Sequence, residues 1–135
     1  MGELQIHWGA VLAAALANFV IGGLWYSPAV FGRVWMRANG FTDADLEKGS
    51  PAVIFGVSFV FCLLMAANLA AFLGSPETTV GFAVGAGIAA GLGWAALGLG
   101  VVALFERRPW SYMLVNGGYL TVSFAAMGLI LGLWR

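Results

Sequence analysis

The positions of the charged residues constrain this chain more than any motif does. They divide the sequence into four uncharged, largely apolar stretches, at residues 4–32, 49–76, 78–105 and 109–134. Each stretch is 26 to 29 residues long, and a helix needs roughly 20 apolar residues to cross the hydrocarbon core of a bilayer. Each stretch is therefore long enough to cross a membrane once and too short to cross it twice.

Composition and pattern support membrane-spanning helices over other structures. Only 9% of the residues are charged and 61% are hydrophobic, whereas a soluble domain carries about 25% charged residues. The stretches lack the alternation of barrel strands, and the first has no basic segment before it as a signal peptide would. We predict an all-α membrane protein of one domain, residues 1–135, with four transmembrane helices. Their expected bounds are about 5–26, 51–73, 78–104 and 110–133.

The loops between these spans predict an orientation. With four crossings, loops 27–50 and 106–109 lie on one side of the membrane. That side carries the side chains Arg33, Arg37, Lys48, Arg107 and Arg108, and the other side carries only Arg135. Basic residues favour the cytoplasm. We therefore expect a multi-pass protein of the cell (inner) membrane with both termini outside the cytoplasm. The net charge of zero argues against a nucleic-acid partner.

Serine–proline pairs mark expected helix starts. Ser27-Pro28, Ser50-Pro51 and Ser75-Pro76 each offer a serine N-cap followed by a proline at the first helical position, where a missing N–H costs nothing. Pro109 is expected to begin the fourth span without a serine.

The first basic loop is expected to hold a short interfacial amphipathic helix at about 28–38, capped by Ser27 and ending near Asn39-Gly40. Its apolar stripe and its two arginines fall on different faces, as in helices that lie in a membrane interface. A second short helix is expected at 43–48, where Thr42 and Asp45 have the spacing of a capping box. The stripe is Phe31, Val34, Trp35 and Ala38, and the candidate ligands for lipid headgroups are Arg33, Arg37, Arg107 and Arg108.

Trp25 and Tyr26, at the end of the first span, have two interpretations. In the favoured one they belong to a hinge that lays the next helix along the membrane, with both rings at headgroup depth. In the alternative both rings turn inward and form walls of a pocket below Asn18. Trp94, midway along the third span, is expected to fill a groove left by glycines, and a ligand wall is its alternative.

Small residues recur at helical spacing in the third span. Gly81, Gly85, Ala89 and Gly93 are four residues apart, and Gly87, Gly91 and Ala95 repeat the spacing on a neighbouring face. Such rows allow helix backbones to approach closely in lipid. The leading functional hypothesis is therefore a non-enzymatic bundle that forms a homo-oligomer or serves as an accessory subunit of a larger membrane complex.

The polar groups expected inside the spans are amides and hydroxyls. Counting 1.5 Å per residue, Asn18 and Asn116 both lie about 11 Å from the cytoplasmic boundary, so they could meet between the first and fourth helices. The candidates for interhelical contacts or a polar cavity are Asn18, Asn68, Asn116, Tyr119 and Thr121. If Asn18, Asn116, Tyr119 and Thr121 lined one path, the protein would be a small transporter or channel, which is the alternative function.

Signs of catalysis are missing from the sequence. It has no nucleophile–histidine pair, no paired carboxylates in a cleft and no phosphate loop. The one histidine, His7, is expected to be an interfacial, hydrogen-bonded residue, because a metal needs several ligands. We expect no catalytic residue, no cofactor and no metal site, with membrane lipids, other copies of the chain or other membrane-protein subunits as partners.

The segment ANFVIGGLWYSPAVFGRVWMRANG, residues 17–40, resembles the N-terminal signature of a family of small four-helix membrane proteins, domain-of-unknown-function family 1761. The resemblance is carried by Gly22-Gly23, Trp25-Tyr26, Pro28, Phe31-Gly32, Trp35 and Gly40, and by the later Asn116-Gly117-Gly118. It implies a four-span layout with a long first loop and transfers no activity and no site residue.

Overall fold

A computed structural model describes residues 4–134, so Glu3 and Arg135 lie outside the described residues. The described chain is helical throughout and has no strand, which confirms the expected all-α class. The elements are α1 (Trp8–Trp25), α2 (Gly32–Asn39), α3 (Asp43–Leu46), α4 (Pro51–Phe72), α5 (Val80–Ala90), the π-helical segment η1 (Gly91–Ala96), α6 (Leu97–Phe105) and α7 (Trp110–Leu133).

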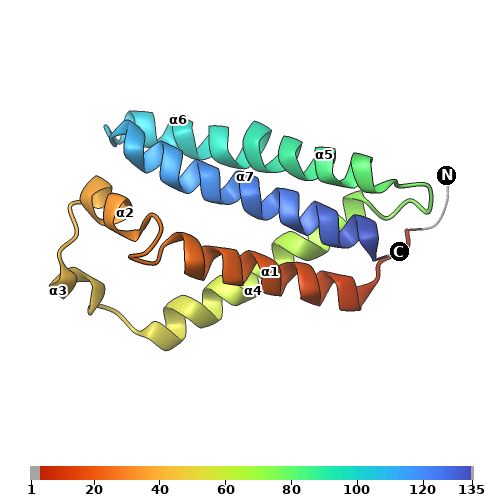
Figure 1. Ribbon diagram of the computed structural model, residues 1–135, viewed down its shortest axis with the longest axis horizontal. Coiled ribbons are helices and arrows are strands. Elements are labelled where there is room, and N and C mark those ends of the chain that lie inside the picture. Colours follow the sequence, from red (N-terminus) through yellow and green to blue (C-terminus); the bar gives the residue numbers. More distant parts are fainter. Residues whose placement is uncertain (1–3, 135) are drawn as a thin grey trace.

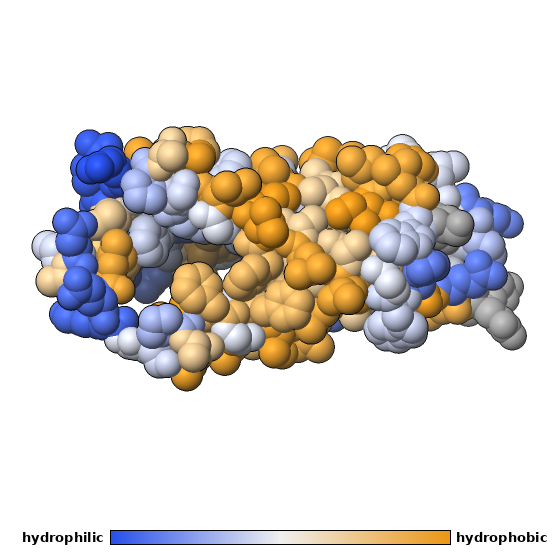
Figure 2. Space-filling view, turned by 60° about the horizontal axis from the view of Figure 1, so that its bottom comes forward, coloured by the Kyte–Doolittle hydropathy of each residue, from blue (hydrophilic) through white to orange (hydrophobic). Residues whose placement is uncertain are grey.

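Four helices are long and apolar enough to cross a membrane: α1, α4, the continuous α5–η1–α6 helix and α7. In Figure 1 the turn between α6 and α7 lies at the same end as α2 and α3, and the start of α1 and the end of α7 lie at the opposite end. We call the first the basic end, after its residues Arg33, Arg37, Lys48, Arg107 and Arg108. Figure 2 shows polar residues at both ends and an apolar band between them, as fits a multi-pass membrane protein.

The core is formed where α7 packs against α1 and α5, and where α4 packs against α1. Alanines dominate the α1–α4 contact, with Ala10 and Ala14 facing Ala66 and Ala70, all at most 5% exposed. Large apolar side chains instead cover the outside of the bundle. The surface therefore suits hydrocarbon, and the interior relies on small residues that let the helices approach closely.

The contact between α5 and α7 requires glycine on both helices. A Cβ atom at Gly87 would lie closer than 3 Å to the carbonyl oxygen of Phe124, and one at Gly128 would meet the carbonyl oxygen of Ala83 in the same way. One turn along α5, a Cβ at Gly91 would lie 2.8 Å from the Leu120 carbonyl oxygen. Backbone therefore packs directly on backbone along this antiparallel pair.

The serine–proline prediction is correct at Ser50 and wrong at Ser27. The Ser50 hydroxyl accepts a hydrogen bond from Val53 N at 3.4 Å, with Pro51 in the first turn of α4. The Ser27 hydroxyl instead donates to the carbonyl of Leu24 at 2.7 Å, at the end of α1. The interfacial helix is therefore not 28–38 but begins at Gly32, where the N-cap Phe31 makes no side-chain hydrogen bond.

Gly32 explains why the chain turns before α2 begins. Its N–H donates to the Ser27 carbonyl at 2.9 Å, and Phe31 N–H donates to the Trp25 carbonyl at 2.9 Å. A Cβ at Gly32 would lie 2.5 Å from the Tyr26 carbonyl oxygen. The tight loop thus leaves Ser27 as a partner of the preceding helix and not as the cap of the next.

Ser75-Pro76 likewise does not begin a helix. Ser75 accepts from Glu77 N at 3.4 Å within a turn, and α5 begins at Val80 with Thr79 as its cap, which accepts from Phe82 N at 3.1 Å. Pro109 is the N-cap residue of α7 and not its first helical residue.

Two further predictions about helix ends can be compared with the structure. α2 ends at Asn39, as expected, and its C-cap Gly40 has a φ of +68°, which favours glycine. The capping box of Thr42 and Asp45 is confirmed, although α3 ends at Leu46 and not at 48.

Trp94 does not fill the groove expected for it. Its side chain is 85% exposed and projects from η1. The face of this segment that carries Gly91 lies against the α7 backbone, where even a Cβ would lie 2.8 Å from both Leu120 O and Phe124 Cβ. That contact leaves no space for an indole ring between the two helices.

Candidate functional site

Two asparagines and two tyrosines near the basic end form one hydrogen-bonded group, the amide–tyrosine cluster: Asn18, Tyr26, Asn116 and Tyr119. The Tyr119 hydroxyl donates to Asn18 Oδ1 and the Tyr26 hydroxyl donates to Asn116 Oδ1, each at 2.5 Å. The tyrosine rings meet edge to face with centroids 5.5 Å apart. The two asparagines do not bond to each other; each bonds to a tyrosine, and the two tyrosine rings meet.

The rings of Trp25 and Tyr26 turn inward onto α7, as in the alternative interpretation of this segment. Trp25 Nε1 donates to the Val115 carbonyl at 2.9 Å, and a Cβ at Gly118 would lie 2.9 Å from the Trp25 ring. Glycine at position 118 leaves space for the indole, and the Val115 carbonyl gives its N–H a partner. The segment from Trp25 to Phe31, which we call the Trp25–Tyr26 corner, is thus a turn whose aromatic residues pack inward and join α1 to α7.

The residues of the candidate polar path bond to one another or to their own helix. Asn18 is fully buried, and the Thr121 hydroxyl donates to the Gly117 carbonyl of its own helix at 2.8 Å. With Tyr119 bonded to Asn18 and Tyr26 bonded to Asn116, these groups form a paired interior. This pairing disfavours a hydrated path along them.

Asn68 and Trp94, which the sequence suggested separately, line the same lateral groove between α4 and α5. The groove has a volume of about 970 Å³, and Phe124 of α7 also lines it. Asn68 Nδ2 donates only to the Leu64 carbonyl of its own helix, at 3.5 Å, so its amide makes no interhelical bond. The other lining residues are mostly apolar or small: Leu64, Met65, Leu69, Phe72, Phe82, Gly85, Ala86, Ala89, Ala90 and Ala95.

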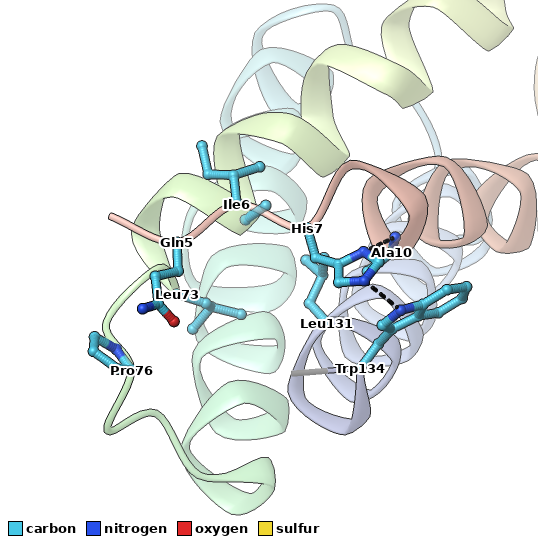
Figure 3. A pocket seen from close by; sticks show the side chains of 9 residues that line it. Gln5, Ile6, His7, Ala10, Leu73, Pro76, Leu131 and Trp134 are labelled. Atoms are coloured by element: carbon cyan, nitrogen blue, oxygen red, sulfur yellow. Dashed lines mark hydrogen bonds between the residues drawn. The ribbon is translucent and has the colours of Figure 1, made fainter. Parts of the chain in front are cut away.

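A second cavity of about 470 Å³ lies at the end opposite the basic end, beside His7 (Figure 3). His7 caps α1, where its Nδ1 lies 3.3 Å from Ala10 N, and its Nε2 lies 2.9 Å from Trp134 Nε1. A neutral imidazole carries one N–H of its own, so only one of these two nitrogens can accept a hydrogen bond. Gln5 and Pro76 lie across the opening in Figure 3. Both ring nitrogens of His7 thus face N–H donors, and neither is open to a metal ion. Among residues 4–134, no group of three or more His, Cys, Asp or Glu side chains could hold one.

The four arginines proposed as headgroup ligands differ in their surroundings. The Arg107 guanidinium donates to the carbonyls of Leu104 and Phe105, each at 3.3 Å, and so caps α6. Arg108 lies 5.3 Å from the centre of the Tyr112 ring. Arg33 and Arg37 are exposed on α2. Within the described chain the one salt bridge joins Lys48 to Asp45, so these two are the arginines best placed for anionic headgroups.

Comparison with known proteins places this geometry in a family. The model of a family described as protein of unknown function, DUF1761, matches residues 9–132. No curated protein and no solved structure matches the chain. The match extends from the second residue of α1 to the penultimate residue of α7 and includes the Trp25–Tyr26 corner and Asn116-Gly117-Gly118. The chain therefore belongs to the DUF1761 family.

Proposed function

We propose that this protein is a non-enzymatic helical bundle of the cell (inner) membrane that assembles with further copies of itself through one face of the α5–η1 helix. The observation that carries the proposal is a row of small residues on that face, the open row, formed by Gly81, Gly85, Ala89 and Gly93. A Cβ atom at each of the three glycines would meet nothing within 4 Å, and Ala89 is exposed.

The open row contrasts with the glycines that face α7. Gly87 and Gly91 pack against backbone and could not carry a side chain without displacing α7. Helices in lipid associate through close backbone packing, because hydrocarbon offers little hydrophobic driving force between them. The open row has the same spacing as the row that α7 covers, which supports a role in packing against another chain.

The orientation proposed for the assembly follows from its charges. Five basic residues gather at the basic end, which supports placing α2, α3 and the α6–α7 turn in the cytoplasm. Both termini then lie outside. Tags at the two ends should be accessible only from outside intact cells or spheroplasts, and labelling of the C-terminal tag only after the membrane is opened would contradict this orientation.

Measuring the mass of the full chain in several mild detergents tests self-association. We expect a multimer whose formation is weakened by Gly85→Leu, which fills the open row. Gly98→Leu is the matched control, because Gly98 also has open space around it but lies off the row on the same span. A monomer in every detergent contradicts the proposal. A stable complex with a different membrane protein would identify the accessory-subunit role instead.

A further inference from the structure

Two methionine sulfur atoms from different helices converge on one buried amide. Asn18 Nδ2 lies 3.9 Å from Met65 Sδ and 3.8 Å from Met127 Sδ. Asn18 and Met127 are fully buried, and Met65 packs at the edge of the same core. α1, α4 and α7 thus each contribute one side chain to a single point inside the bundle.

A hydrogen bond to its oxygen fixes the orientation of the Asn18 amide. Tyr119 donates to Asn18 Oδ1, so the NH₂ group is the part that faces the sulfurs. Contacts from N–H to thioether sulfur are weak, because thioether sulfur is a poor acceptor. The sulfur lone pairs are therefore directed at a partially positive group to which they bind weakly.

Ser123 adds a buried hydroxyl beside Tyr119. Its side chain is fully buried, its Oγ makes no hydrogen bond of regular geometry, and it interacts with the Tyr119 side chain. Ser123 lies four residues after Tyr119 and four before Met127, which places all three on one face of α7. Since Tyr119 and Met127 both contact Asn18, the Ser123 hydroxyl is on the face of α7 that forms this site. A buried hydroxyl that makes no regular hydrogen bond is available as a further oxygen ligand.

We propose that Met65, Met127 and Asn18, with Ser123 beside them, form a binding site for a soft monovalent metal ion, Cu(I) or Ag(I). Thioether sulfur is a ligand that selects soft ions such as Cu(I) over hard ones such as Mg²⁺ and Ca²⁺. Methionine side chains are flexible enough to close on an ion.

A half-turn of the Asn18 amide converts the site from donor to acceptor. The turn would direct Oδ1 toward the sulfurs and NH₂ toward Tyr119, whose hydroxyl oxygen can accept a hydrogen bond as well as donate one. The number of hydrogen bonds between Asn18 and Tyr119 is then unchanged. The metal ion would then face the Asn18 carbonyl oxygen, which can bind a cation, and not the NH₂ group, whose partial positive charge repels one.

The lateral groove provides a route to the site. Met65 lines the groove between α4 and α5 and also contacts Asn18. Its thioether can therefore bind an ion at the groove and transfer it inward by changing rotamer. The ligands lie in the interior of one chain, so metal binding requires no second copy, although Gly85 and Ala89 of the open row also line this groove.

Titrating the full chain with Ag(I) in mild detergent tests the proposal. Cys62 is buried one turn before Met65 and would bind Ag(I) through its thiol, so the measurements use Cys62→Ala protein. We expect about one Ag(I) per chain to survive desalting, and its loss when Met65→Leu and Met127→Leu are added. Adding Met36→Leu and Met113→Leu instead should leave binding unchanged. The proposal is overturned if Cys62→Ala protein retains no Ag(I), or if the two control substitutions reduce binding as much as the test pair.

A second measurement avoids reliance on the leucine variants. Exchanging methionine for leucine conserves volume and usually costs less than about 1.5 kcal/mol, and circular dichroism will show whether the helices persist. If the double variant does not fold, X-ray absorption of Cu(I)-loaded Cys62→Ala protein gives the answer. Sulfur neighbours around the copper support the site, and a shell of only oxygen and nitrogen overturns it.

Discussion

Replacing Gly87 with alanine should separate α5 from α7. The new Cβ would lie 3.0 Å from the Phe124 carbonyl carbon, closer still to its oxygen, and 3.4 Å from the Ala125 Cα, whereas ordinary contacts are 3.4–4 Å. All three atoms belong to backbone, so no side-chain rotation relieves the overlap. The helices would have to move apart by roughly 1 Å, which in a packed interior costs about 1–3 kcal/mol.

Alanine also favours the helix itself, which offsets part of this cost. The gain over glycine is up to about 1 kcal/mol, so Gly87→Ala should lower the free energy of unfolding by up to about 2 kcal/mol. Gly98→Ala is the control, because Gly98 has open space around its Cα, and this change should leave stability equal or increased. A loss of stability in Gly87→Ala together with no loss in Gly98→Ala would show that the loss comes from packing against α7 and not from helix propensity.

Reversible unfolding of the full chain in mixed micelles, followed by circular dichroism, measures both variants. The α5–α7 backbone contact would be refuted if Gly87→Ala were as stable as Gly98→Ala. A matching loss in both variants would show that the span tolerates no alanine for reasons unrelated to α7.

Three further changes test local structure. Thr79→Ala removes the cap of α5 and should lower the unfolding free energy by about 1 kcal/mol, whereas Ser27→Ala, at a residue that caps no helix, should cost less; equal losses would contradict this. Gly118→Ala places a Cβ 2.9 Å from the Trp25 ring, so tryptophan fluorescence should change, and an unchanged spectrum would argue against this contact. The backbone N–H of Thr42, followed by Lys48, lowers the pKa of Asp45. The cap of α3 should therefore hold above the ordinary carboxyl pKa and be lost as pH falls through the lowered one, and an NMR titration giving an unshifted pKa would contradict it.

The spans and several helix ends were predictable because they depend on local chemistry. Long uncharged stretches must be helical in lipid, and Ser50 and Thr42 cap the residues that directly follow them. The predicted N-caps at Ser27 and Ser75 were wrong because a serine hydroxyl can equally bond to a preceding carbonyl or close a turn. All three serine–proline pairs look alike in the sequence. The helices after Ser27 and Ser75 begin later because of residues further along: Gly32 allows the tight turn before α2, and Thr79 caps α5.

Contacts between helices were less predictable, because the sequence indicates depth along a helix better than direction around it. Asn18 and Asn116 were expected to meet between the first and fourth helices, but the sequence did not show that each would bond to a tyrosine instead. The same uncertainty applied to Trp94, which lies outside because α7 occupies the other face of its helix. The pairing of Met65 with Met127 across α1 depends on the directions of three helices at once, and no motif signals it.

The amide–tyrosine cluster leads to a prediction that separates its two halves. Tyr119→Phe leaves Asn18 Oδ1 fully buried without its donor, which should lower the unfolding free energy by about 1–3 kcal/mol. Tyr26→Phe frees the oxygen of Asn116, which is only half-buried and nearer the basic end, where water can replace the phenol.

We therefore expect the loss in Tyr26→Phe to be smaller, close to the 0.6 kcal/mol that is about average for interhelical hydrogen bonds in membranes. The two variants are matched, because each removes one hydroxyl and keeps the ring, so the ring contact between Tyr26 and Tyr119 is preserved. Unfolding in mixed micelles compares them directly. A larger loss for Tyr26→Phe would mean that water reaches Asn18 more readily than Asn116, and the hydrated path between α1 and α7 would then again be a candidate.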